Sequence, residues 1–587
     1  MRARQRQKAG QQQGSVLALV IIVMIVLTMV GMGMLKVGQG QLQQAIRLKN
    51  QELAFSAAEA AYEKSTFWMS QQVDMLSALN DDGASGTLNF THSNADYSVQ
   101  FSTFLGARPV YRITVNGTAG IYQRTITAYV VQAVSGWDVA TCKIPSGPNQ
   151  AAMAYFTTGE VIDMPMHVNN QNDSPDNRDI YTYGTPRFLG VMSLGENRYT
   201  ASGSDKYNSV MGLFEGGIHF NQPASRIANP DSVTQKVDRF EQFTNPSYRF
   251  TPQVVQTLPK DSSGKTGFYT GTVSEVPATQ LKFYVKNGEG YVRIYDNCTV
   301  AAYTRGGKSN NSWDYRASSG GGSSFEKYGI YGCHYTTGTY TDVRIDDPSS
   351  PIYVKQDFGG IESKPGAQIY VDGNVVIGCS QEDAAVLGAS LNTVKGQLSV
   401  VATGNIWITN SLKVDGSRDA KGVPAADNPN VLGLIASGVI KVADPGMSEN
   451  GLLTKVSDFN PALVSGYEPI GITDKAPIYS RKLPQTVEVE ASLTMGLGGW
   501  GAENLYRSSS FTPRKNFQTN KNDTLILRGT RCEAMVGLTA SGKNGFLEHD
   551  YFDSRMITGI VPGNIWLKGK YVLIPGGWSE TSTINNN

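Results

Sequence analysis

The chain of 587 residues has no excess of charge of either sign. It contains 51 Lys and Arg against 50 Asp and Glu, a formal net charge of +1, and charged residues make up only 17% of the sequence. Average soluble proteins contain about 25% charged residues. A global electrostatic attraction to nucleic acid is therefore excluded, and we expect no nucleic-acid partner.

Cysteine and histidine are also scarce, with five of each. Because the sequence has neither a CxxC nor an HExxH motif, it offers no zinc site, thioredoxin-like redox centre or metalloprotease site. We predict no catalytic residue, no cofactor and no metal. An odd number of cysteines leaves at least one thiol unpaired. Cys298 and Cys333 bracket a Gly-Ser-rich stretch and are the pair that we expect to form a disulfide in an oxidising compartment, with reduced structural cysteines as the alternative.

Only one long apolar run is present, the 21 residues from Ser15 to Leu35, which contain no charge. At about 1.5 Å per residue a helix of this length spans about 31 Å, the thickness of a bilayer core. Its basic residues Arg2, Arg4, Arg6 and Lys8 precede the run, so the positive-inside rule predicts a cytoplasmic N-terminus and an external remainder. A cleaved signal peptide and a buried soluble helix are the alternatives.

The helix is expected to continue outward from Gln41 to Gln72, a stretch without Pro or Gly that is rich in strong helix formers. Small and apolar residues recur in it at three- and four-residue spacings and predict a packing stripe: Leu42, Ala45, Ile46, Leu53, Ala57, Ala60 and Ala61. The stripe could cover the protein's own sheet or meet a helix of a partner protein, and spacing alone leaves both open.

A basic leader ending in Gly14, the apolar helix and the motif LAFSAAEAAYEK (Leu53 to Lys64) together resemble the N-terminal module of type IV pilus assembly proteins of the PilX type. The resemblance implies that a prepilin peptidase cuts between Gly14 and Ser15. It further implies insertion in a bacterial inner membrane, contact with other pilin-like subunits through the helix, and an ectodomain in the periplasm or on the cell surface. Two positions depart from major pilins, which carry Glu where this chain has Leu19 and commonly Phe where it has Ser15.

Alternating apolar and polar residues after the helix predict four antiparallel strands: Thr87 to Phe90, Tyr97 to Phe101, Tyr111 to Val115 and Ile121 to Val131. We therefore expect a mainly β protein with one long N-terminal transmembrane helix. The expected units are a leader (1–14), the transmembrane and extended helix (15–72), a pilin-like antiparallel sheet (73–136), a β-rich region with loops (137–350) and a repeat region (351–587).

The repeat region contains three similar segments: IYVDGNVVI, VVATGNIWI and LIASGVIKV. They align on Gly373, Gly404 and Gly438, which are 31 and 34 residues apart. This spacing predicts coils of a parallel β-solenoid with the three glycines at its turns, and a β-sandwich is the alternative. For Gly404 we expect a turn of positive φ. The predicted inward-facing residues are Val371, Val375, Ile377, Ala402, Ile406, Ile408, Ala436, Ile440 and Val442.

The function that these features favour is a non-enzymatic, pilin-like minor component of a type IV pilus or related secretion filament, acting in assembly or in tip-mediated adhesion to a surface glycan or host ligand. The alternative is a membrane-tethered β-solenoid enzyme acting on polysaccharide. Such an enzyme needs two carboxylates about 5 to 10 Å apart, for which the candidates are Asp163, Asp346, Asp347 and Asp553. The Asx-rich loops at Asn169 to Asp179 and Asp415 to Asn430 offer oxygen ligands for calcium but lack EF-hand spacing.

Overall fold

The computed structural model describes most of the chain. The described residues are 3–72, 75–105, 108–132, 137–141, 143–145, 151–153, 155–168, 180–195, 200–201, 211–220, 240–241, 244–254, 273–304, 328–335, 339–354, 357–358, 361–362, 366–379, 383–443, 469–473, 476–479, 483–484, 486–496, 498–502, 523–537, 539–541, 544–558 and 571–584.

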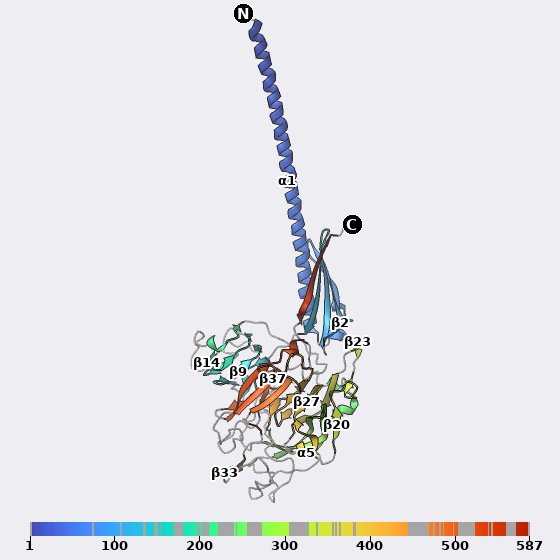
Figure 1. Ribbon diagram of the computed structural model, residues 1–587, viewed down its shortest axis with the longest axis vertical. Coiled ribbons are helices and arrows are strands. Elements are labelled where there is room, and N and C mark those ends of the chain that lie inside the picture. Colours follow the sequence, from blue (N-terminus) through green and yellow to red (C-terminus); the bar gives the residue numbers. More distant parts are fainter. Residues whose placement is uncertain are drawn as a thin grey trace.

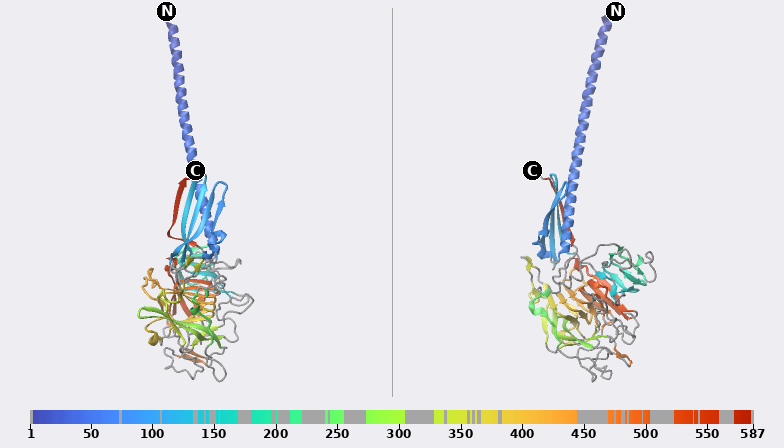
Figure 2. Two further views of the ribbon diagram at one scale, coloured as in Figure 1. Left: turned by 90° about the vertical axis from the view of Figure 1, so that its right-hand side faces the viewer. Right: turned by 180° about the vertical axis from the view of Figure 1, so that it is seen from behind.

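One long helix projects from a β-rich body (Figures 1 and 2). Helix α1 (Ala3–Gln71) has 69 residues and confirms the predicted continuation of the apolar run into the amphipathic stretch. At about 1.5 Å per residue its length is about 100 Å. It is helical through the expected leader as well, because the sequence from Ala3 contains no proline to interrupt it.

An antiparallel sheet lies beside the lower end of α1 (Figure 1). It contains the four expected strands, β1 (Ser85–Asn89), β2 (Asn94–Leu105), β3 (Arg108–Ala119) and β4 (Tyr122–Gln132). The predicted meander is therefore confirmed. A fifth strand, β40 (Tyr571–Ile584), comes from the other end of the chain and pairs antiparallel with β4, giving the order β1-β2-β3-β4-β40.

The rest of the β-rich body is inserted between β4 and β40. Residues 137–570 therefore leave and re-enter the same sheet at neighbouring strands, where Gln132 pairs with Tyr571. This long-range pairing extends the sheet that was expected from residues 73–136 alone. We call the small sheet together with the part of α1 that packs on it the helix module, and residues 137–570 the ectodomain.

The three repeat segments stack in parallel with the register that their alignment predicts. Their first halves form β24 (Gly366–Val371), β28 (Gln397–Ala402) and β31 (Val431–Ala436), and their second halves form β25 (Asn374–Ile377), β29 (Ile406–Ile408) and β32 (Ile440–Val442). Ile369 pairs with Val400, and Val400 pairs with Leu434. All nine predicted inward-facing residues belong to the main hydrophobic core. For the whole of 351–587 a solenoid stays a prediction.

The stack continues beyond the three repeats. It runs through β35 (Thr486–Met495) and β37 (Asp523–Met535) on one sheet and β36 (Trp500–Ala502) on the other. Parallel to β37 lies β5 (Trp137–Thr141), followed outward by β10 (Met166–Val168), β13 (Met192–Leu194) and β15 (Ile218–His219). Two stretches far apart in sequence thus build one sheet, with the junction at β5 and β37.

The three aligned positions of the repeats require glycine for two different reasons. Gly373 has φ of +154°. For Gly404 the expectation of positive φ is wrong, since neither Gly404 nor Gly438 is among the positive-φ residues of the described chain. Instead a Cβ at Gly404 would lie 2.9 Å from the carbonyl oxygen of Gly373 and would overlap the side-chain oxygen of Asn374, while one at Gly438 would overlap the corresponding oxygen of Asn405.

These asparagine side chains link successive repeats. The Asn374 Oδ1 atom accepts a hydrogen bond from the Asn405 backbone at 2.9 Å, and the Asn405 Oδ1 atom accepts one from the Val439 backbone at 3.1 Å. Each bond satisfies a backbone donor at a turn, where no strand partner is in line. Gly404 and Gly438 therefore leave room for the asparagine of the preceding repeat, Asn374 and Asn405 respectively.

Antiparallel strands extend the sheet that contains β25, β29 and β32. It is formed by β17 (Val273–Lys286), β18 (Glu289–Thr304) and β19 (Tyr328–Tyr335), with β17 pairing parallel to β25. In the register of β18 and β19, Cys333 is opposite Val300 and Cys298 is opposite Tyr335. The expected disulfide between the two cysteines stays a prediction, because the side chain of Cys333 lies outside the described residues.

Candidate functional site

The upper part of α1 is apolar and exposed. The helix from Val16 is long and apolar enough to cross a membrane, with a mean hydropathy of 2.9 in its most apolar window and none of that window buried in the protein. Leu17 is 63% exposed and Met34 71%. In water such a surface would cost much of the stability of the fold, so it is suited to the hydrocarbon core of a bilayer. The segment fits membrane anchoring.

The lower part of α1 packs on the small sheet through a stripe of small side chains. Ala54, Ala57, Ala58 and Ala61 are all buried, and they face strand residues such as Ile113. The approach is closest at Gly117 of β3, where a Cβ would lie 2.8 Å from the backbone nitrogen of Ala58 and would overlap the carbonyl oxygen of Ala54. Alanines on the helix and glycine on the strand thus allow the two backbones to come close.

The predicted packing stripe divides between two environments. Ala57 and Ala61 are buried against the sheet, as the expectation of a helix covering its own sheet requires. Leu42 and Ile46 are 61% and 50% exposed, Ala45 is exposed, and Leu53 and Ala60 are half-buried. Sequence spacing could not separate these two sets, because a helix rich in alanine offers more than one small-residue face.

The side of α1 opposite the sheet forms a second continuous face. Its residues recur at three- and four-residue intervals, so they follow one side of the helix: Leu42, Ala45, Lys49, Glu52, Ser56, Ala60, Glu63 and Phe67. All are exposed except the half-buried Ala60, and Phe67 is 68% exposed. We call these residues the outer face. A second helix could approach closely at Ala45, Ser56 and Ala60, with Lys49 and Glu63 available for ion pairs.

The carboxylates considered for polysaccharide chemistry are engaged by other residues. Asp163 pairs with Lys421 at 2.5 Å and Asp346 with Arg344 at 2.8 Å. Asp347 accepts hydrogen bonds from the backbone and hydroxyl of Ser349, which lower the pKa of its carboxyl group.

Asp553, the fourth candidate, is a buried structural residue. Its carboxylate pairs with the guanidinium of Arg555 at 2.7 Å, and both side chains are 2% exposed. Arg555 also donates to the backbone carbonyl of Asn430 at 2.8 Å. The pair therefore fixes the loop before β31 to the segment after β39 (Asn544–Phe552), and no polysaccharide can reach it.

Sequence reasoning missed a buried cluster of charges around Arg531. The guanidinium of Arg531 pairs with Asp550 at 3.1 Å, with Glu533 at 3.8 Å and with Glu548. Glu160, which is 4% exposed, lies beside them and accepts a hydrogen bond from the Thr157 backbone at 2.7 Å. These residues come from β37, β39 and the turn before β9 (Val161–Asp163), and no local sequence pattern links them.

Burial changes the acidity of this cluster. The pKa of Glu160 is raised to about 8, first because burial penalises its charged form and second because Glu548 is a neighbouring acid. The pKa of Asp550 is also raised, chiefly by burial, in spite of the attraction of Arg531. A single guanidinium cannot balance the charge of several buried carboxyl groups. Some of these carboxyl groups therefore stay protonated at neutral pH. The cluster is enclosed, which makes it a structural joint between strands.

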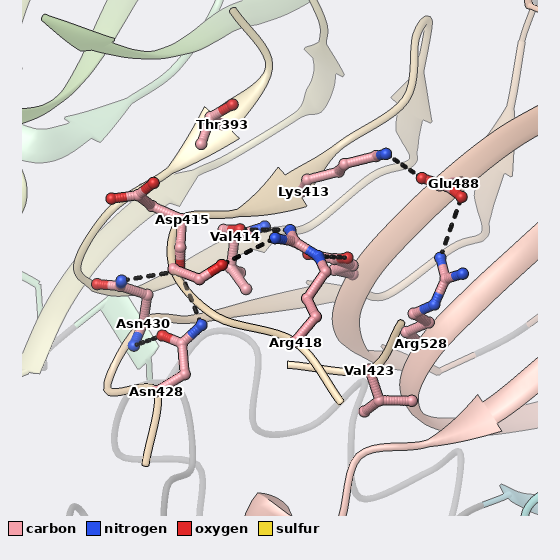
Figure 3. A network of polar contacts seen from close by, with 12 residues as sticks. Thr393, Lys413, Val414, Asp415, Arg418, Val423, Asn428, Asn430, Glu488 and Arg528 are labelled. Carbon is pink, nitrogen blue, oxygen red and sulfur yellow. Dashed lines mark hydrogen bonds and ion pairs between the residues drawn. The ribbon is translucent and has the colours of Figure 1, made fainter. Parts of the chain in front are cut away.

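The Asx-rich loop from Asp415 to Asn430 is held by hydrogen bonds within the protein (Figure 3). The backbone carbonyl of Asp415 accepts from the side-chain amides of Asn428 at 2.8 Å and Asn430 at 3.0 Å. Arg418 donates to both carboxylate oxygens of the buried Glu490, at 3.0 and 2.8 Å. No group of three or more His, Cys, Asp or Glu side chains that could hold a metal ion occurs in the described part of the chain. The other calcium candidate, Asn169 to Asp179, lies outside the described residues.

Together these features define a class of protein. It is a mainly β protein with one long N-terminal helix, apolar and exposed above, packed on an antiparallel sheet below, and carrying an inserted ectodomain of stacked parallel strands.

Comparisons with known proteins add little to this description. No family model and no curated protein matches the sequence. Among solved structures the chain is similar to the competence-associated pilin ComZ from Thermus thermophilus, with 12% sequence identity, a TM-score of 0.28, and coverage of 91% of this chain and 98% of that one. A TM-score this low transfers neither fold nor function. The functional proposal therefore rests on the geometry of α1 and its sheet.

Proposed function

We propose that this protein is a non-enzymatic, pilin-like minor component of a type IV pilus or a related secretion filament. The observation that carries the proposal is the division of α1 into an exposed apolar upper part and a lower part packed on an antiparallel sheet. A helix built in this way can hold the chain in a membrane and then serve as a packing element among other helices. The motif from Leu53 to Lys64 and the leader ending in Gly14 agree with this role.

Processing of the leader is the first part of the proposal. A prepilin peptidase in the bacterial inner membrane cuts between Gly14 and Ser15, on the cytoplasmic side, and the ectodomain is periplasmic or displayed on the surface. Intact-mass measurement of the membrane-extracted protein tests this directly. We expect a chain that begins at Ser15, and a Gly14→Leu variant should keep all 14 leader residues. A wild-type chain that retains Met1, or that is cut after Gly33, would contradict the proposal.

The second part concerns the partners of α1. The outer face packs against the N-terminal helices of other pilin-like subunits, because its small residues permit close approach and its mixed charges can be matched by a neighbour. Ser56→Arg places a long charged side chain on this face, where Ser56 is exposed. We expect this variant to fold and to be lost from sheared filaments. Ser417→Arg, at an exposed residue of the ectodomain, is the matched control and should be incorporated normally.

The third part concerns the ectodomain. Its size relative to the helix module (Figure 1) supports a role beyond filament packing, and we assign it to assembly or to adhesion at a filament tip through a surface glycan or host ligand. A glycan array probed with the purified chain tests this part. Tyr370 and Trp407 do not serve as stacking platforms for sugars, because they are only 4% and 1% exposed.

A further inference from the structure

Strand β40 covers the edge of β4 that the rest of the small sheet leaves open. It makes ten residue pairs with β4, from Tyr122 with Ile584 to Gln132 with Tyr571. Without β40, β4 would be an edge strand that presents a long row of unpaired backbone groups. The sheet on which α1 packs is therefore completed by a segment that follows the entire ectodomain in the chain.

Strand β40 also contacts α1 directly. The ring of Trp578 meets that of Tyr62 edge-on, with centroids 5.1 Å apart and an interplanar angle of 89°. Partial burial raises the pKa of the Tyr62 hydroxyl, as expected for a half-buried ring on α1 that a ring of β40 contacts. At the other end of β40, Tyr571 contacts Tyr111 with ring centroids 5.7 Å apart, and it packs on the same cluster as Ala57.

A second connection runs through Arg124 of β4. Its guanidinium lies 3.9 Å from the carboxylate of Glu580 and 5.8 Å from the centre of the Phe55 ring on α1. Glu580 also accepts a hydrogen bond from the Trp578 indole at 2.8 Å. The residues of β40 that face α1 are thus joined to one another and to the helix.

A bulge in β40 sets this orientation. The register shifts between Ala128 and Val130, which pair with Trp578 and Leu573. In the bulge Gly576 has φ of +73°, and a Cβ on Gly577 would lie 2.8 Å from the carbonyl oxygen of Tyr129. The two glycines allow the chain to accommodate the extra residues of the bulge. Trp578 therefore lies opposite the buried Ala128, on the side of the sheet that α1 covers.

We propose that β40 is a closing strand that makes firm packing of α1 conditional on a folded ectodomain. The physical reason is loop closure. Bringing Tyr571 to Gln132 across an unfolded chain of several hundred residues costs conformational entropy, whereas a folded ectodomain holds these two ends together in advance. Unfolding the ectodomain therefore weakens the docking of β40, and loss of β40 loosens α1. The coupling is independent of what α1 assembles with.

Hydrogen exchange of the full-length chain in detergent tests this inference. The readout is the exchange rate of peptides covering residues 54–69 of α1, compared with peptides covering β28 and β31. We expect Trp578→Ala to raise exchange in 54–69 by roughly tenfold through local opening and to leave β28 and β31 unchanged. Thr581→Ala is the matched control, because Thr581 alternates with Glu580 on β40 and faces away from α1. Equal exchange in 54–69 for both variants and wild type would overturn the proposal.

A reversible disulfide between β4 and β40 distinguishes undocking of β40 from general misfolding of a variant. Thr127 and Ser579 are direct register partners, so Thr127→Cys with Ser579→Cys can join β4 to β40 covalently. In the reduced form, denaturant that unfolds the ectodomain should raise exchange in 54–69. In the oxidised form, 54–69 should stay protected at the same denaturant concentration. If the reduced form also keeps 54–69 protected after the ectodomain has unfolded, α1 does not depend on the ectodomain and the proposal fails.

Discussion

Gly117 of β3 lies directly against the backbone of α1 at Ala54 and Ala58, so closely that a Cβ at position 117 would be 2.8 Å from the Ala58 nitrogen. The contact joins residues that the sequence places 59 and 63 positions apart. It also fixes how near α1 sits to the sheet, because neither partner has a side chain that can rearrange.

Gly117→Ala should therefore destabilise the helix module. The added methyl group meets backbone atoms, which cannot rotate away, and overpacking of this kind costs about 1 to 3 kcal/mol. Thermal unfolding, monitored by hydrogen exchange in residues 54–69, measures this loss of stability. Gly212→Ala is the control, since a Cβ there meets nothing within 4 Å. Equal melting of the two variants would show that α1 can shift on the sheet without cost.

Gly404→Val should destabilise the ectodomain more than Ser417→Val. The valine side chain would displace Asn374, whose Oδ1 atom accepts the backbone hydrogen bond of Asn405, whereas Ser417 is exposed. We expect a loss of about 1 to 3 kcal/mol at position 404 and little change at 417. Calorimetric midpoints of the two variants check this prediction, which fails if both melt at the wild-type temperature.

Stability should fall as pH rises from about 4.5 to about 8, through Glu160. Its pKa is near 4.5 in the unfolded chain and about 8 in the fold, so the folded state binds the proton more tightly across this range. The contribution is fully present below pH 4.5 and is lost as pH passes through 8. Asp550 adds a slope of the same sign, since its pKa is raised as well.

The Glu160→Gln variant removes this ionisation. We expect it to be more stable than wild type at pH 8 and to show a smaller pH slope between 5 and 8 in melting experiments. Glu215→Gln is the control. Glu215 is an exposed acid whose pKa is lowered by Arg187, so it stays charged throughout that range. A wild-type slope in the Glu160 variant would mean that another group titrates.

Asp553→Asn should unfold the ectodomain more readily, because it leaves the buried Arg555 without its counter-charge. Breaking a buried ion pair on one side costs about 3 to 5 kcal/mol. Asp163→Asn breaks a pair whose lysine is 60% exposed and should cost about 1 kcal/mol or less. Denaturation midpoints distinguish the two. Loss of polysaccharide turnover in the Asp163 variant without a stability change would instead support the enzymatic alternative.

The protein should be a rare subunit at a filament tip or in a priming complex. A compact ectodomain of residues 137–570 has a radius of gyration of about 22 Å, whereas packed helices lie only about 8 to 10 Å apart. Ectodomains this wide cannot follow one another along closely packed helices. Quantitative mass spectrometry of sheared filaments should find this chain at a few per cent of the major subunit, and equal amounts would contradict the assignment.

Local sequence patterns were sufficient for α1, for β1 to β4 and for the register of the three repeats. Each of these rests on short-range periodicity: an uncharged apolar run, alternation of apolar residues along strands, and glycines at nearly constant spacing. The inward-facing positions such as Ile406 followed from the same alternation. These elements are determined where neighbouring residues in the chain carry the whole signal.

Tertiary structure alone decided the pairing of β40 with β4, the joining of β5 to β37 and the cluster of Glu160 with Arg531. Each brings together residues hundreds of positions apart, and no local pattern records which strand edge or which charge lies opposite. The same holds for the faces of α1. Spacing marked its small residues, but only the sheet determines that Ala57 is buried while Ala45 stays exposed, because burial depends on what packs against the helix.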